Sequence, residues 1–190
     1  MKRIVIFASG SGTNAENLIQ YFNQKKEVSV VQVLTNNPHA KVIDRCNNLK
    51  ISCLSFNRTA FYIENHILDI LKTINPDVIV LAGFLWKFPE SILKEFPNKV
   101  INVHPALLPK YGGKGMYGMR IHEAVVYNHE KETGITIHYV NEHYDEGTII
   151  FQASCTVGNN DTATTVAEKI HKLEMEHFPR VVESFLFPNG

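Results

Sequence analysis

The stretch KRIVIFASGSGTNAENLIQYF, residues 2–22, joins two different hydrophobic periods across a glycine-rich turn. Residues 2–9 form a continuous apolar run that is typical of a buried strand. Thr13 and Glu16 match a capping box at the start of a helix. Four apolar residues then recur at helical spacing: Ala15, Leu18, Ile19 and Phe22. A buried strand that leads into an amphipathic helix predicts an α/β fold.

The same alternation continues through the first 104 residues. Further strands are predicted at 28–36, 51–56, 77–84 and 99–104, and helices at 40–50, 61–74 and 89–96. The links between them are short. This pattern predicts a Rossmann-like, mostly parallel twisted sheet with helices on both faces.

The second half of the chain differs in composition. A loop at 105–119 contains four glycines and two prolines, and loops of this length in compact domains commonly carry function. A helix is predicted from near Arg120, followed by strands at 134–141 and 147–157. A long helix is predicted from 161 to 187, disturbed at Pro179. No internal repeat or linker is evident, so residues 1–190 are expected to form a single domain.

Charge and composition exclude several classes of protein. Nineteen basic and nineteen acidic residues give a net charge of zero, which argues against a nucleic-acid surface. No apolar stretch approaches the roughly 20 residues of a membrane helix. Three cysteines without a CxxC pair fit a reducing compartment. We therefore expect a cytoplasmic monomer or homodimer that acts on small molecules, with no nucleic-acid or membrane partner.

The glycine-rich turn at residues 9–14, SGSGTN, predicts an anion site. Gly10 and Gly12 would let a phosphate approach the backbone amides at the helix start. A plain turn without a ligand is the alternative. The turn also matches the dinucleotide fingerprint through Ala15, but the second predicted strand ends in LTNNP at 34–38, without the acidic residue that binds the ribose of NAD. The sequence therefore favours a phosphate over a dinucleotide.

A second site is predicted at the end of the strand at 99–104. Asn102 and His104 are two residues apart, so both side chains leave the same face of a strand. Pro105 restricts the backbone that follows. Together with Asp145, these groups could polarise a carbonyl and supply a proton. The alternatives are a core histidine at 104 and an ordinary turn aspartate at 145.

A metal site is a further alternative for the same region. His138, His143 and Asp145 are all potential zinc ligands. No fourth ligand is evident in the sequence, and strand alternation does not group the three side chains. We therefore expect no metal.

Four segments in the same order resemble those of the glycinamide ribonucleotide formyltransferases of purine synthesis. They are SGSGTN at 9–14, VLAGFL at 80–85, INVHPALLP at 101–109 and GITIHYVNEHYDEGTII at 134–150. The resemblance covers the whole chain. It implies the formyltransferase fold, with a phosphate-binding half at about 1–104 and a folate and catalytic half at about 105–190.

The resemblance also implies a reaction and its catalytic residues. A formyl group would pass from 10-formyltetrahydrofolate, as co-substrate, to the amine of glycinamide ribonucleotide. Asn102 would donate a hydrogen bond to the formyl oxygen. Protonated His104 would stabilise the oxyanion and act as proton donor, and Asp145 would favour that protonated form.

Binding residues follow from the same resemblance. Gly12, Thr13 and Asn14 would hold the substrate phosphate, and Glu174 would contact the sugar. The folate contacts implied are Arg58, Leu85, Trp86, Lys87, Phe88, Asn102 and Val140. The chain departs from the family pattern in having Leu85, Trp86 and Lys87 where a Met-Arg pair usually follows the GF, and in a longer loop at 110–119.

Two other functions are compatible with these motifs. The acceptor could be another amine, such as that of a nucleotide sugar. The glycine-rich turn could also belong to a non-catalytic nucleotide-binding domain, although Asn102, His104 and Asp145 together argue against it.

Overall fold

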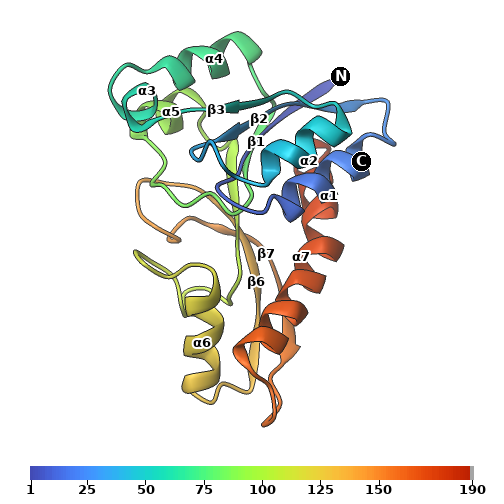
Figure 1. The fold of residues 1–190 in the computed structure, drawn as a ribbon, viewed down its shortest axis with the longest axis vertical. Coiled ribbons are helices and arrows are strands. Elements are labelled where there is room, and N and C mark those ends of the chain that lie inside the picture. Colours follow the sequence, from blue (N-terminus) through green and yellow to red (C-terminus); the bar gives the residue numbers. More distant parts are fainter. Residues whose placement is uncertain (189–190) are drawn as a thin grey trace.

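A seven-stranded mixed sheet forms the centre of the computed structural model, which describes residues 1–188 (Figure 1). Its strands lie in the order β3-β2-β1-β4-β5-β6-β7. The strands are β1 (Lys2–Phe7), β2 (Val28–Thr35), β3 (Cys53–Ser55), β4 (Val78–Leu81), β5 (Val100–His104), β6 (Glu132–Tyr139) and β7 (Ile149–Thr156). Strands β1 to β5 are parallel to one another. β6 pairs antiparallel with β5, and β7 pairs antiparallel with β6. The predicted mostly parallel α/β fold is confirmed. Residues 189 and 190, the end of the expected domain, lie outside the described residues.

Helices cover both faces of this sheet. They are α1 (Thr13–Phe22), α2 (Val42–Leu49), α3 (Arg58–Tyr62), α4 (His66–Ile74), α5 (Glu90–Glu95), α6 (Met119–Tyr127) and α7 (Ala163–Leu186). Strand alternation divides the core into two layers. Ile4 and Ile6 of β1 belong to the layer that also contains residues of α1, α2, α6 and α7. Val5 and Phe7 belong to the layer on the opposite face, with residues of α3, α4 and α5.

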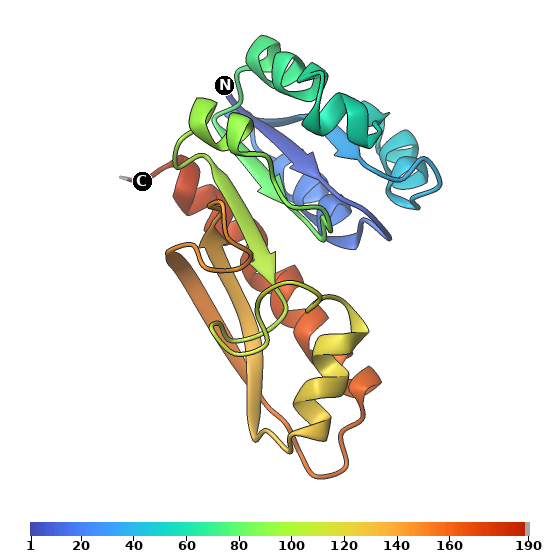
Figure 2. The same cartoon turned by 90° about the vertical axis from the view of Figure 1, so that its left-hand side faces the viewer.

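The long helix α7 connects the two halves of the molecule. It packs against α1 at one end and against α6, β6 and β7 further along (Figure 2). The disturbance predicted at Pro179 is wrong, because α7 continues through this residue to Leu186. Pro179 and its neighbour Phe178 are buried in the core, and this packing offsets the hydrogen bond that proline cannot donate. Within residues 1–188, no helix combines the length and apolar character needed to cross a bilayer.

Two local predictions need correction on the other face. The helix expected at 61–74 is two helices, because Asn65 adopts a left-handed conformation at φ 57° between α3 and α4. The first of them begins earlier than predicted, where the Asn57 side chain accepts a hydrogen bond from the backbone N–H of Ala60 at 2.9 Å. The strand expected at 51–56 is limited to the three residues of β3.

The predicted capping box at Thr13 and Glu16 is also wrong. The N-cap of α1 is Gly12 at φ 74°, and no side chain caps this helix. Glu16 pairs with Arg45 of α2 instead. A Cβ atom at position 12 would lie 2.5 Å from Cγ2 of Val42, so the packing of α2 against the turn requires glycine. The helix therefore begins with amide groups that no side chain occupies.

Close packing of β6 and β7 depends on Gly134. A Cβ atom there would lie 2.0 Å from the carbonyl oxygen of Ala153 and 2.7 Å from Cδ2 of Leu107. We expect Gly134→Ala to lower the free energy of unfolding by about 1–3 kcal/mol or more, measured by urea denaturation. Gly158→Ala is the matched control, because its Cβ would meet nothing nearer than 3.6 Å. Equal stability of the two variants would contradict this account of the sheet.

Candidate active site

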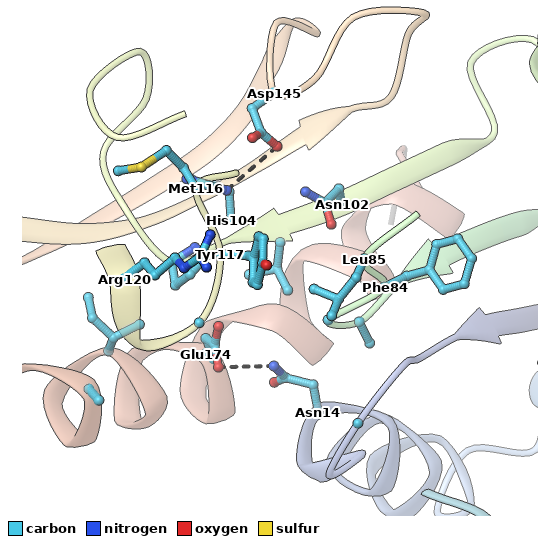
Figure 3. Close-up of a pocket in the computed structure, with 18 of the residues that line it drawn as sticks. Asn14, Phe84, Leu85, Asn102, His104, Met116, Tyr117, Arg120, Asp145 and Glu174 are labelled. Carbon is cyan, nitrogen blue, oxygen red and sulfur yellow. Dashed lines mark hydrogen bonds and ion pairs between the residues drawn. The ribbon is translucent and has the colours of Figure 1, made fainter. Parts of the chain in front are cut away.

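A cavity of about 730 Å³ lies at the C-terminal ends of β1, β4 and β5. The chain leaves β1 toward α1 on one face of the sheet and leaves β4 toward α5 on the other. Because these neighbouring strands lead to opposite faces, their ends form the crevice in which ligands of α/β sheets bind. The cavity walls come from residues 10–14, 82–85, 102–105 and 113–118, with part of α7 (Figure 3).

Asn102 is held in place by a histidine from the neighbouring strand. β5 and β6 pair so that Asn102 lies opposite His138, and Asn102 Nδ2 is 3.1 Å from His138 Nε2. The other ring nitrogen of His138 donates to the carbonyl oxygen of Tyr139 at 2.8 Å. Burial lowers the pKa of His138 despite the opposing effects of the Tyr139 carbonyl and Asp145. A neutral ring with Nδ1–H can only accept at Nε2, so Asn102 donates one amide hydrogen and keeps a second.

His104 has one ring nitrogen committed to the backbone. Its side chain is buried, and Nε2 lies 2.8 Å from the carbonyl oxygen of Tyr111. Because a carbonyl only accepts, Nε2 carries a hydrogen. Nδ1 faces Asp145 Oδ1 at 3.5 Å. The nitrogen available for a proton at the cavity is therefore Nδ1.

Asp145 does more than close a turn. Its backbone is left-handed at φ 59°, as aspartate in turns can be. Its side chain nevertheless points at the histidines, with Oδ1 3.5 Å from His104 Nδ1 and 3.7 Å from His138 Nε2. Oδ2 accepts a hydrogen bond from the backbone N–H of Gly113 at 2.9 Å. The carboxylate thus lies beside both rings and also holds the long loop.

The residues predicted to bind the substrate lie at another part of the same cavity. Gly12, Thr13 and Asn14 line it at the start of α1, and Glu174 lines it from α7. Asn14 Nδ2 donates to Glu174 Oε2 at 2.9 Å (Figure 3). His171 lies 3.7 Å from that oxygen, and Glu174 raises the pKa of His171 through this contact. The amide nitrogen of Asn14 is therefore paired with Glu174.

The predicted folate residues divide between two cavities. Leu85 lines the large cavity. A smaller one of about 60 Å³ is lined by Trp86, Lys87, Phe88 and Val140, and both cavities share Asn102 and Asp145. Phe88 is buried in the core, with 4% of its surface exposed. Arg58 lines neither cavity, and its guanidinium lies 4.6 Å from the centre of the Trp86 ring.

The structure does not bring His138, His143 and Asp145 together as a metal site. The ring of His143 is exposed and lies near Glu142, at 3.8 Å. In the part of the chain that the structure describes, no three His, Cys, Asp or Glu side chains are placed to hold a metal ion together.

Sequence reasoning missed several residues of the cavity. His138 was considered only as a metal ligand, although it is the hydrogen-bond partner of Asn102. Tyr117, Arg120 and His122 also line the cavity, and the Arg120 guanidinium lies 5.1 Å from the centre of the Tyr117 ring. The glycines at 112–118 indicated a functional loop, but no spacing in the sequence indicated which side chains near it would face the cavity.

Comparison with known proteins gives consistent full-length matches. The model of the formyl transferase family matches residues 2–182. The phosphoribosylglycinamide formyltransferase of Bacillus subtilis is 33% identical, covering all of this chain and 97% of its own length. That of Haemophilus influenzae is 30% identical, over 97% of this chain and 87% of its own. The crystal structure of phosphoribosylglycinamide formyltransferase from Bacillus halodurans superposes with a TM-score of 0.88 at 32% identity, covering 100% of this chain and 97% of that one.

The lowered pKa of His138 predicts a pH-dependent stability. The unfolded chain takes up a proton near pH 6.5, whereas the folded protein resists protonation of this ring until a lower pH. The free energy of unfolding should therefore fall as the pH decreases from about 6.5. In His138→Gln the loss between pH 7.5 and 5.5 should be smaller, as measured by urea denaturation at both values. The exposed His143→Gln is the control, and an equal pH dependence in all three proteins would contradict the prediction.

Proposed function

Because this chain belongs to the phosphoribosylglycinamide formyltransferase family, we propose that it transfers the formyl group of 10-formyltetrahydrofolate to the amine of glycinamide ribonucleotide. The observation that carries this proposal is the convergence of Asn102, His104 and Asp145 beside two adjoining cavities. An amide, an imidazole and a carboxylate at one point are suited to a carbonyl that becomes an oxyanion.

The shape of the site supports a defined placement of the two substrates. The substrate phosphate binds at the start of α1, where the first-turn amides have no side-chain cap. The amine reaches the other part of the cavity, at Asn102 and His104. The pterin of the folate enters from the smaller cavity beside Trp86 and Val140. Asn102 and Asp145 line both cavities. The formyl carbon of the folate therefore meets the substrate amine beside these two residues.

Attack by the neutral amine forms a carbon–nitrogen bond and moves the carbonyl electron pair onto oxygen. The free amide hydrogen of Asn102 and a proton on His104 Nδ1 stabilise this oxyanion. Each fixed donor of this kind contributes about 2.7–4 kcal/mol. The carboxylate of Asp145 lies 3.5 Å from Nδ1 and places a negative charge beside the imidazolium that carries this proton.

Breakdown of the intermediate releases the folate amine. The bond from the formyl carbon to N10 breaks, and N10 keeps the electron pair and takes a proton from His104 Nδ1. The attacking nitrogen gives up one proton, which restores the protonated ring. Proton transfer of this kind is typically worth about 10²–10⁴ in rate. His138 takes part indirectly, because it orients the Asn102 amide.

Asp145→Asn tests the catalytic unit. Asparagine tolerates the left-handed backbone of position 145, so the fold should be retained while the charge beside His104 is lost. We expect kcat to fall by about 10²–10⁴ with a small change in KM, measured by formyl transfer at pH 7. The exposed Glu146→Gln is the matched control. A normal kcat in Asp145→Asn would overturn the role of the carboxylate.

Coupling between Asn102 and His104 gives a second test. Both groups serve one oxyanion, so Asn102→Ala and His104→Ala should each lower kcat more than they raise KM. The double variant should lose less than the sum of the two losses in activation free energy. Strict additivity would mean that the two side chains act at separate steps.

Gly12→Ala tests the phosphate end of the cavity. The new Cβ would lie 2.5 Å from Val42 Cγ2 and 2.8 Å from Val42 Cα, so the turn must shift and move the amides of α1. We expect the KM for glycinamide ribonucleotide to rise at least tenfold while formyl folate affinity stays near that of the wild type. A dephosphorylated substrate should bind both proteins equally weakly. Equal binding of phosphorylated and dephosphorylated substrates by the wild type would place the phosphate elsewhere.

A further inference from the structure

His122 is a buried histidine that the catalytic scheme does not use. It lies in α6, with 6% of its surface exposed, and lines the large cavity. Its Nδ1 is buried and has no hydrogen-bond partner among residues 1–188. Buried polar atoms of folded proteins are nearly always paired, because an unpaired one has lost its bonds to water. A residue of the cavity wall that carries such an unpaired atom therefore indicates a group that a ligand completes.

A second unpaired atom lies at the same cavity. Asn14 is 9% exposed, and its Oδ1 is buried without a partner in the described chain, although its Nδ2 donates to Glu174. The charge of Glu174 acts on the His122 ring and favours its protonation, but burial has the larger effect and lowers the pKa of His122. His122 is therefore a neutral ring with one N–H and one lone pair.

The chemistry of these groups defines the ligand. Asn14 Oδ1 and the Glu174 carboxylate are acceptors, so they need hydroxyl or N–H donors. A phosphate brings no hydrogens at neutral pH and would be repelled by the Glu174 charge. Neighbouring hydroxyls both donate and accept, so they suit two acceptors and a neutral imidazole. In glycinamide ribonucleotide such a pair, the ribose diol, lies between the phosphate and the glycinamide amine.

We propose that His122 is a substrate-binding residue that completes, with Asn14 and Glu174, a site for the ribose hydroxyls. The proposal rests on the proposed function, because the placement of the ribose follows from a phosphate at α1 and an amine at His104. His122 then selects an acceptor that carries an intact ribose diol between its phosphate and its amine. It contributes to binding and takes no part in the transfer step.

The thermal stability of the protein without substrate distinguishes this role of His122 from a purely structural one. A histidine that stabilises the fold through its hydrogen bonds loses stability when it is replaced by an apolar residue. A buried imidazole nitrogen without a partner has no such bond to lose, and an apolar side chain of similar size removes its desolvation cost. His122→Leu should therefore have a Tm equal to or above that of the wild type, while its affinity for the substrate falls.

Binding of glycinamide ribonucleotide and its 2′-deoxy and 3′-deoxy analogues, measured by calorimetry, tests the proposal. We expect His122→Leu to weaken binding of the full substrate by roughly three- to tenfold, the range for one neutral hydrogen bond. The variant should no longer distinguish the substrate from one of the two deoxy analogues. His122→Gln, which keeps a donor and an acceptor, should recover part of the affinity. Affinity for formyl folate and kcat at saturation should stay near the wild-type values in both variants.

The exposed His66→Leu, on α4 far from the cavity, is the matched control. Wild-type affinity in His122→Leu, or undiminished discrimination against both deoxy analogues, would overturn the role of His122 alone. A fall in Tm with equal loss of every ligand would assign His122 to the fold. If the wild type failed to bind glycinamide ribonucleotide while the control remained folded, the proposed function would fail, and this inference with it.

Discussion

The carboxylate of Asp145 is the point on which the site depends, because it lies against three separate parts of the chain. It accepts a hydrogen bond from Gly113 of the long loop and lies 3.5 Å from His104 of β5 and 3.7 Å from His138 of β6. One partly buried carboxylate thus lies against a loop and two strands. Each histidine also donates a hydrogen bond that limits rotation of its ring, from His104 to the Tyr111 carbonyl and from His138 to the Tyr139 carbonyl. Groups held this way need little reorganisation during the reaction.

Such a cluster is costly to assemble, and the remainder of the fold offsets that cost. Tyr111 and Asp145 both adopt left-handed backbone conformations, and Nδ1 of His122 and Oδ1 of Asn14 are buried without partners in the described chain. Strained and unpaired groups of this kind persist where the surrounding structure holds them and are typical of functional sites. Here two apolar layers pack on either face of the sheet, and α7 connects the halves that carry the two parts of the cavity.

Charge separates the two parts of the cavity. At the part proposed to be catalytic, the Asp145 carboxylate lies 3.5 Å from His104 Nδ1. Near Glu174, burial keeps His122 neutral, which suits hydroxyl groups better than a phosphate. Two buried histidines of the same cavity wall thus have different surroundings. Glu174 belongs to this second group through its bond to Asn14, and in the proposed binding mode the phosphate binds the amides of α1.

The hydrophobic periods of the sequence were sufficient to predict the α/β fold, because strand and helix patterns depend on neighbours within a few residues. The same local rule placed Asn102 and His104 on one face of a strand.

The sequence could not show that His138 orients Asn102, since that contact depends on the antiparallel register of β5 with β6. Nor could it show that His122 faces a cavity, because on a helix it has the same spacing as a core residue. The cap of α1 was likewise decided by tertiary packing, because a Cβ at Gly12 would meet Val42 of α2. Local periodicity determined the order and type of the main strands and helices and the shared strand of Asn102 and His104. Only tertiary structure decided which distant side chains complete each hydrogen bond, because those distances are set by strand register and helix packing.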